Sequence, residues 1–241
     1  MTATPERRAG APYWSLAGLV KGVRLSLAAL LALALFAAAF GTLAAQKGLT
    51  LLEAALMSAL MFAGASQFVA MEIWTDPMTA ATMTTLGLVT AVVNMRFLLM
   101  SASLRPWLGG LPAVQSYPAL ALLVEPAWLL AIRYRAEGGS DASVYAGAVI
   151  AMWVVWVAAT IPGYLLGTLV SDPYRFGLDL VLPSFFIAML VPMWRGPRLA
   201  IAWAVAGATA LIVAELLPGW WFIMAGAVAG SIAGGLLDEH D

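Results

Sequence analysis

Cysteine is absent from this 241-residue sequence, and histidine occurs once, at His240. The absence of cysteine excludes disulfide frameworks, thiolate metal sites and cysteine nucleophiles. The single histidine lies in an acidic tail with Asp238, Glu239 and Asp241. No imidazole is therefore expected inside the fold as a base, a metal ligand or a proton relay. The sequence predicts neither a metal site nor a cofactor.

Charged residues are also scarce. They make up 10% of the chain, against 63% hydrophobic residues, and the formal net charge is −1. Soluble domains have about 25% charged residues. The apolar excess is larger than one soluble core needs, so we expect the chain to lie in a lipid bilayer. The net charge gives no indication of nucleic-acid binding.

Long apolar runs recur along the chain. A helix needs about 20 mainly apolar residues to cross the hydrocarbon core. We expect an all-α fold, a polytopic transmembrane helix bundle of about seven or eight spans, at 25–45, 49–74, 79–101, 113–132, 142–170, 177–193, 199–217 and 220–237. The second run is the longest after the fifth and has room for a broken helix.

The expected domain organisation is simple. Residues 1–24 form a cytoplasmic N-terminal segment, 25–237 a single transmembrane domain, and 238–241 an acidic C-terminal tail. The first apolar run is longer than the core of a cleaved signal peptide, which has 7–15 residues, so we expect it to be retained.

Lysine and arginine predict the orientation, because cytoplasmic loops carry an excess of both. With eight straight spans and a cytoplasmic N-terminus, eight cations lie inside: Arg7, Arg8, Lys21, Arg24, Arg133, Arg135, Arg195 and Arg198. Three lie outside: Lys47, Arg105 and Arg175. The distribution favours a multi-pass protein of the cell (inner) membrane with both termini in the cytoplasm.

Arg96 lies within an apolar run, in Asn94-Met95-Arg96. A guanidinium cannot be neutralised by losing a proton, so it needs a carboxylate, carbonyls, water or an anionic ligand. We expect Arg96 in the outer part of its span, at a level where Asp179 or Glu53 can pair with it. Two interpretations stay open: a permanent structural ion pair, or a role in gating or in binding a substrate carboxylate.

A second candidate site is Gly64-Ala65-Ser66-Gln67, in the middle of the run at 49–74. Glycine permits local unwinding, which frees backbone groups to bind a ligand. The Gln67 amide adds an acceptor and two donors. The alternative is a face of small residues that packs against another helix.

A third candidate is Glu125-Pro126, in the run at 113–132. A proline inside a helix frees a backbone carbonyl about one turn upstream. Glu125 could carry a proton, and either Glu125 or Asp179 could bind the ammonium of a ligand. The alternative is a kinked packing helix with a hydrogen-bonded Glu125.

These stretches together resemble the AzlC family, the large subunit of bacterial branched-chain amino acid exporters. The similar stretches are Gly64-Ala65-Ser66-Gln67-Phe68, Asn94 through Ser101, Glu125, and Gly177-Leu178-Asp179-Leu180 through Ala188. The resemblance implies secondary-active export of branched-chain or similar small apolar amino acids, driven by an ion or proton gradient. It also implies a small AzlD-like membrane partner subunit.

The residues assigned to substrate binding or coupling are therefore Gly64, Ser66, Gln67, Asn94, Arg96, Glu125 and Asp179. The chain contains no Gly-x-x-x-x-Gly-Lys-Ser/Thr loop for ATP. Two other functions are considered. An intramembrane serine hydrolase needs a base beside its serine, and no intramembrane histidine or lysine is available. A non-transporting scaffold subunit has little use for costly charges inside the membrane.

Overall fold

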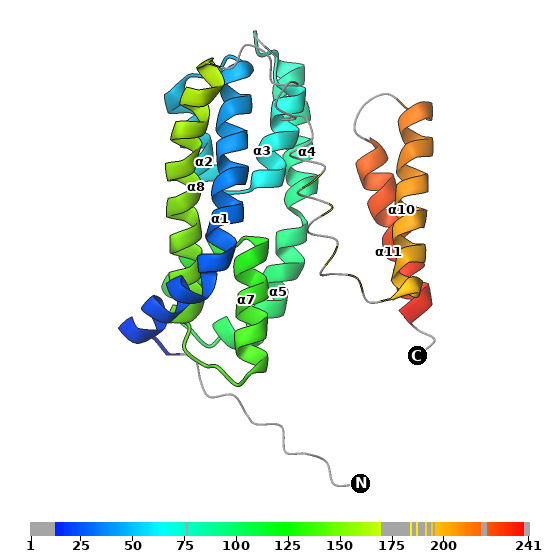
Figure 1. Cartoon of the computed structure of the whole chain (residues 1–241). Coiled ribbons are helices and arrows are strands. Elements are labelled where there is room, and N and C mark those ends of the chain that lie inside the picture. Colours follow the sequence, from blue (N-terminus) through cyan, green and yellow to red (C-terminus); the bar gives the residue numbers. More distant parts are fainter. Residues whose placement is uncertain are drawn as a thin grey trace. The chain divides into compact units, whose positions relative to one another are not determined.

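The computed structural model describes residues 13–75, 77–169, 197–217 and 221–238, with isolated positions at 184, 187, 191, 194 and 196. The chain divides into two compact units, Met1–Val181 and Leu182–Asp241. Apart from an isolated bridge between Tyr13 and Asp141, the regular structure of the described residues is helical (Figure 1). The expected all-α fold is confirmed, whereas the single domain over 25–237 stays a prediction.

Three helices in the described part of the chain are long and apolar enough to cross a bilayer. They are α1 (Leu16–Gln46), α8 (Ser143–Leu169) and the continuous pair of α4 (Ala80–Asn94) and α5 (Arg96–Leu108). Below, the end of the bundle where α1 begins is the N-side, and the end where α1 finishes is the far side.

Helices α1 and α8 pack in parallel over their whole length through glycines. A side chain on Gly22 would collide with the carbonyl of Val144, and one on Gly163 with the backbone of Ala38. The Thr42 hydroxyl donates to the Gly163 carbonyl at 2.9 Å. Small residues let helix backbones approach closely, which is how helices gain packing energy in lipid. The pair forms the core of the first unit.

The first ends of α1 and α8 are joined by a polar cluster on the N-side. The Ser15 hydroxyl donates to the Asp141 carboxylate, which also accepts from the Ser143 backbone N–H at 2.9 Å. The Ser15 N–H donates to the Ser143 hydroxyl at 2.7 Å. Asp141 is buried. These bonds satisfy backbone groups that helix termini leave unpaired, and they fix the register of the two helices.

Between α1 and α4, the chain forms a hairpin of two short helices, α2 (Leu51–Met61) and α3 (Gly64–Ile73). The preceding loop lies on the far side, where Tyr164 near the end of α8 donates to the carbonyl of Leu49 at 2.7 Å. The Gln67 amide lies 3.4 Å from the Ser58 hydroxyl, so α3 runs back beside α2. Both helices therefore lie on the far-side half of the bundle (Figure 1).

A second hairpin, α6 (Ala113–Ala121) and α7 (Glu125–Ala136), enters from the N-side. Its first turn lies beside the start of α1, because Trp14 donates to the Gln115 amide at 2.8 Å. Helix α7 then runs in the same direction as α5: Trp128 donates to Ser103 at 2.8 Å, and Arg135 stacks over Trp107 at 5.9 Å. Figure 1 shows α7 beside α5 in the N-side half.

The expectation of straight crossings at 49–74 and 113–132 is therefore wrong, although the broken helix in the second run is confirmed. Each run breaks in its middle and returns to the side from which it came. As a result, the predicted placement of Arg105 opposite Arg133 and Arg135 is also wrong. Arg105 lies in the last turn of α5, next to Trp107, on the same side as Arg135.

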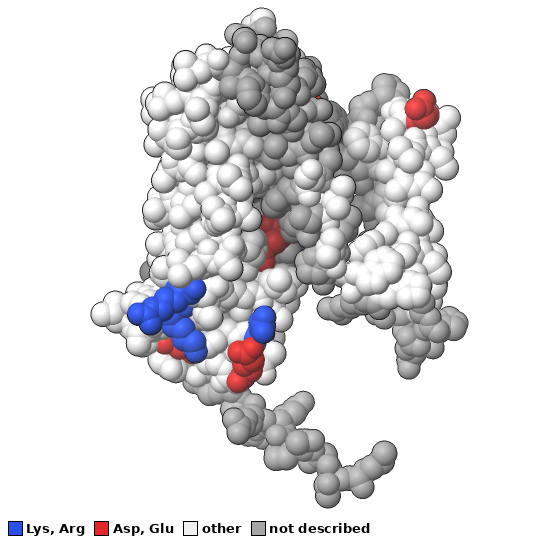
Figure 2. Space-filling view, viewed as in Figure 1, with Lys and Arg blue, Asp and Glu red and all other residues white. Residues whose placement is uncertain are grey.

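Most of the described cations of the first unit gather on the N-side (Figure 2). Lys21 lies over the Tyr134 ring at 4.9 Å, and Arg24 is one turn further along α1. Arg105, Arg133 and Arg135 are on the same side. Only Lys47, the residue that ends α1, lies on the far side among the described cations of this unit outside the membrane core.

The second unit contains an antiparallel helix pair, α10 (Pro197–Leu216) and α11 (Trp221–Asp238). Gly226 faces Ala206 and Ala210, and Gly230 faces Ala202 and Ala206, so positions rise along one helix as they fall along the other. Helices form where runs were expected at 199–217 and 220–237. The run expected at 177–193 lies outside the described residues, apart from three isolated positions.

The hairpins can be tested by labelling, because the natural chain has no cysteine. Single cysteines at Lys47 and Thr75 should react with a membrane-impermeant maleimide from one side. Cysteines at Gly110 and Glu137 should react from the other side. Straight crossings would place Lys47 and Thr75 on opposite sides, and that labelling pattern would contradict the fold.

The glycine contact between α1 and α8 is tested by Gly163→Ala. The added methyl collides with Ala38, so the free energy of unfolding should fall by about 1–3 kcal/mol, the usual cost of overpacking. Gly87→Ala in α4 is the matched control, because nothing lies within 4 Å of a side chain at that position. Thermal unfolding in detergent should show a lower midpoint for the first variant alone, and equal midpoints would refute the contact.

Candidate functional site

The two hairpin tips and the junction of α4 with α5 all lie near half depth in the first unit. Arg96 begins α5, about 24 Å along the helix from Ala80 and about 18 Å from Leu108 at 1.5 Å per residue. The predicted position of Arg96 in the outer part of its span is therefore wrong. The span continues well past Ser101, which places Arg96 near the middle.

The tip of the far-side hairpin is formed by Phe62 and Ala63. Phe62 has the left-handed φ of 30°, an uncommon conformation for a bulky residue. Gly64, expected to unwind the helix, is instead the first residue of α3. A side chain at Gly64 would collide with the rings of Trp156 and Phe36. This glycine therefore permits a close approach, and the break lies just before it.

Gln67 fastens this hairpin to α8. Its side chain is fully buried, its amide oxygen accepts from the Trp156 indole at 3.0 Å, and its amide nitrogen reaches Ser58 at 3.4 Å. Ser58 in turn bonds the Thr160 hydroxyl at 2.8 Å. This network supports the packing interpretation of the Gly64–Gln67 stretch, and a substrate-binding role of Gln67 stays a prediction.

An aromatic cluster surrounds the same network. The Phe36 and Phe68 rings stack at 4.6 Å, and Trp156 meets both Phe36 and Phe62 edge to face. Such pairs add to the free energy of area burial. The far-side hairpin is thus held to α1 and α8 by both polar and aromatic contacts.

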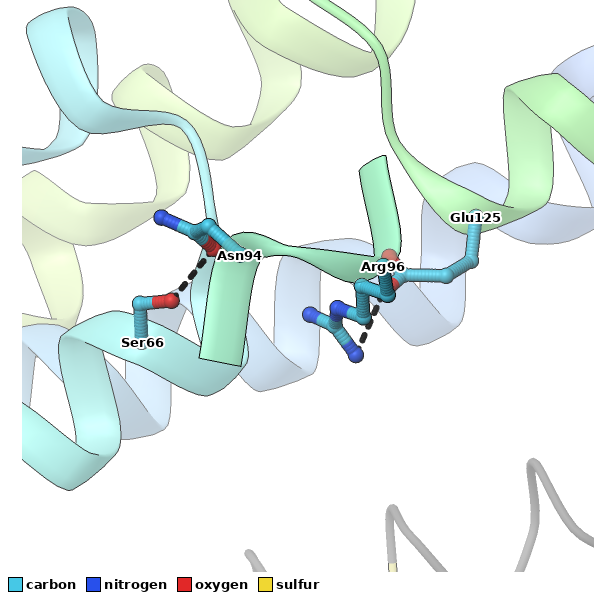
Figure 3. Close-up of polar contacts among 4 residues, drawn as sticks. All are labelled: Ser66, Asn94, Arg96 and Glu125. Atoms are coloured by element: carbon cyan, nitrogen blue, oxygen red, sulfur yellow. Dashed lines mark hydrogen bonds and ion pairs between the residues drawn. The ribbon is translucent and has the colours of Figure 1, made fainter. Parts of the chain in front are cut away.

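Ser66 and Asn94, two residues assigned to the site, meet at half depth. The Ser66 hydroxyl donates to the Asn94 side-chain oxygen at 2.5 Å (Figure 3). Ser66 is fully buried, and Asn94 is the last residue of α4. The bond connects the far-side hairpin to the junction of α4 and α5. An amide acceptor cannot activate a serine as a base would.

Arg96 and Glu125 form an ion pair beside this bond. Arg96 Nη1 lies 2.6 Å from Glu125 Oε1, and the side chains are 29% and 15% exposed. Figure 3 shows the two side chains pointing toward one another from α5 and α7. The partner of Arg96 in this structure is Glu125, not Glu53. The Glu53 carboxylate instead accepts from the backbone and hydroxyl of Thr50 in a capping box on α2.

Glu125 is the first residue of α7, and this corrects the interpretation of Pro126 as a helix kink. Pro126 lies in the first turn, where its missing N–H leaves no hydrogen bond unmade. The bend comes earlier, where Leu122 ends α6 and Val124 is extended. The carboxylate therefore stands at a hairpin tip rather than on the side of a long helix.

Arg96 retains an unused donor. Its Nε atom is buried and has no hydrogen-bond partner among the described residues, and the contact with Glu125 uses a terminal nitrogen. A carboxylate can bind two guanidinium nitrogens in a planar fork. The arrangement can therefore bind an anionic group more fully than the present pair does.

The remaining assigned residue, Asp179, lies outside the described residues, together with the stretch 177–183 around it. Its predicted pairing with Arg96 stays a prediction. Within the described ranges, no group of three or more histidine, aspartate or glutamate side chains could hold a metal ion.

Sequence reasoning missed Ser58, Trp156 and Thr160. Hydroxyl residues are common in apolar helices because they can bond to a carbonyl one turn earlier, as Thr160 does to Trp156 at 2.9 Å. A serine or threonine in an apolar run is therefore a weak signal. Only the spatial approach of α2, α3 and α8 shows that these groups share one network.

The model of the AzlC protein family matches residues 28–170. This stretch contains most of α1, both hairpins, the α4–α5 helix and α8, and so includes every site residue assigned within the described part of the first unit. No curated protein and no solved structure is significantly similar to the chain.

The buried hydrogen bonds of Gln67 to Trp156 and Ser58 predict an effect on the stability of the fold. Gln67→Ala leaves the buried Trp156 N–H without its acceptor, so unfolding should become easier by about 1–3 kcal/mol. Gln115→Ala is the control, because this side chain is exposed and changes of that kind fall within about 0.5 kcal/mol. Chemical denaturation in detergent measures the free energy of unfolding of both variants. A Gln67 variant as stable as the control would show that the bond to Trp156 does not stabilise the fold.

Proposed function

The chain belongs to the AzlC family, and from this premise we propose that it is a secondary-active transporter. It exports branched-chain or similar small apolar amino acids and is driven by an ion or proton gradient. Membership of the family supports a transport-related function in a membrane, and the long apolar helices agree with it. Export, and branched-chain amino acids as its substrate, go beyond what family membership supports and are proposed here.

The Arg96–Glu125 pair at half depth is the observation that carries the proposal. Charged side chains inside a membrane are expensive and usually mark a transport pathway or a ligand site. Here they stand where one hairpin tip meets the α4–α5 junction, beside the Ser66–Asn94 bond. Broken helices that meet at the midplane are the usual construction of substrate sites in secondary transporters.

The charge distribution supports a cytoplasmic N-side. With hairpins in place of straight spans, Arg105 joins Lys21, Arg24, Arg133 and Arg135, and Lys47 is the one far-side cation among the described residues of the first unit. This bias is stronger than that expected for eight straight spans. We therefore propose a multi-pass protein of the cell inner membrane that moves its substrate from the N-side to the far side.

A small AzlD-like membrane subunit is part of the proposal, as the family resemblance implies. The helix Ala80–Leu108 supports this subunit, because only 6% of an apolar stretch of 18 residues within it is buried among the described residues.

A non-transporting scaffold gains nothing from the central ion pair. A serine hydrolase is disfavoured, because the described partner of Ser66 is the amide of Asn94.

Export can be measured as the efflux of valine, leucine, isoleucine and methionine from loaded cells or vesicles. Wild type should export at least one of them, and Arg96→Ala should reduce the rate at least about tenfold. The reason is that loss of one partner of a close charge pair costs more than 1.4 kcal/mol, which is tenfold in affinity.

Arg133→Ala is the matched control, since this arginine pairs with Glu137 on the N-side and is 82% exposed. It should export at the wild-type rate. Unchanged export by Arg96→Ala would remove Arg96 from the mechanism. A wild type that exports none of these amino acids would contradict the proposed function itself.

A further inference from the structure

We infer that the Arg96–Glu125 ion pair is itself the receptor for the substrate. A zwitterionic α-amino acid separates the two side chains, with its carboxylate on Arg96 and its ammonium on Glu125. The inference rests on the proposed function and names the two charged groups that a substrate must carry. It assigns a distinct ligand to each member of the pair.

Charge balance is the first argument. At half depth neither charge is readily left without a partner, since an unpaired charge away from water is strongly unfavourable. A ligand with one charge that entered between the side chains would leave one of them uncompensated. A free amino acid at neutral pH has an ionised carboxyl and a protonated amino group. It therefore compensates both side chains in one step, without a net change of charge or a proton transfer.

The second argument is the unused donor on Arg96. The present contact joins Nη1 to one oxygen of Glu125 at 2.6 Å, and the buried Nε has no hydrogen-bond partner among the described residues. A carboxylate that binds side-on takes Nε and a terminal nitrogen together, which is the preferred planar fork. A substrate carboxylate can therefore satisfy a donor that Glu125 leaves unpaired.

The third argument is the way in which the two partners are held. Glu125 stands at the tip of the N-side hairpin, directly after the buried Val124. On the other side, Ser66 of the far-side hairpin is bonded to Asn94. The backbone is thus held on both sides of the pair, and a rotation of the Arg96 and Glu125 side chains is enough to separate them. The Arg96 side chain, 29% exposed, is open to a ligand.

The chain also offers a comparison pair. Arg133 and Glu137 form the other ion pair among the described residues, 3.3 Å apart and one turn from each other on α7. They are 82% and 65% exposed, so water can solvate either one alone. The reasoning that makes Arg96–Glu125 a receptor therefore does not apply to them.

The first test uses wild-type full-length protein in liposomes, with radiolabelled L-valine as the probe. Unlabelled L-valine should displace it. Isobutylamine, which lacks the carboxylate, and 3-methyl-2-oxobutanoate, which lacks the ammonium, should each need at least about a tenfold higher concentration. Either analogue competing as well as L-valine would overturn the inference, because only one charge would then be read.

The second test is a reciprocal change of ligand preference. Glu125→Gln should bind L-valine at least about tenfold more weakly but should accept 3-methyl-2-oxobutanoate, whose carboxylate meets a free Arg96. Arg96→Gln should lose L-valine in the same way and accept isobutylamine on Glu125. A merely structural pair would instead weaken all three ligands by the same factor, and that outcome would refute the receptor.

Controls separate the possible failures. Arg133→Gln and Glu137→Gln should keep the wild-type order of ligands. If either site variant fails to fold, the competition on wild type still decides. A wild type that exports L-valine but does not discriminate against the analogues overturns this inference alone. A wild type that neither binds nor exports an amino acid overturns the proposed function as well.

Discussion

The close contact between α1 and α8 is the constraint on which the first unit depends. In lipid, helices gain little from hydrophobic burial against each other and must gain packing energy from proximity. Gly22, Gly41, Gly147 and Gly163 remove the side chains that would keep the two backbones apart. The resulting wall carries the indole of Trp156 and the hydroxyl of Thr160, to which the far-side hairpin is bonded. Without α1 and α8, no surface would bury the backbone groups that the break between α2 and α3 leaves without helical partners.

The breaks between the short helices explain where the polar residues gather. A hairpin tip at half depth leaves backbone groups without helical partners, and lipid offers none, so such tips occur only inside protein. Around the tips of this unit lie Ser66, Asn94, Arg96 and Glu125, each from a different short helix or helix end. The same geometry that demands a polar surrounding thus creates a place where a small charged molecule can bind. The two hairpins differ in attachment. The far-side one is fastened by buried polar and aromatic contacts, whereas in the N-side one α7 has buried residues and α6 has none.

Sequence patterns predict the lipid environment, the helical class and the need of Arg96 for a partner, but not the path of the chain between the long helices. The break at Phe62–Ala63 carries no signal, because both residues are apolar and a left-handed phenylalanine has no sequence pattern. Glu125-Pro126 does carry a signal, because proline in a first turn is typical of a helix start, but the same dipeptide also fits a kink inside a longer helix. The partner of Arg96 depends on the direction in which α7 runs. Hydropathy does not contain that information, since a hairpin and a straight span have the same composition.

The shortness of the hairpin helices has a consequence for biogenesis. Helices of 9–12 residues are too short to span the hydrocarbon core. They also end at half depth, where lipid would strip their backbone of partners. A translocon can therefore release α1, the α4–α5 helix and α8 as independent inserted segments, whereas α2–α3 and α6–α7 can become buried only after those three have assembled around them. Maturation of this unit is thus ordered in time, and the region around the Arg96–Glu125 pair is completed last.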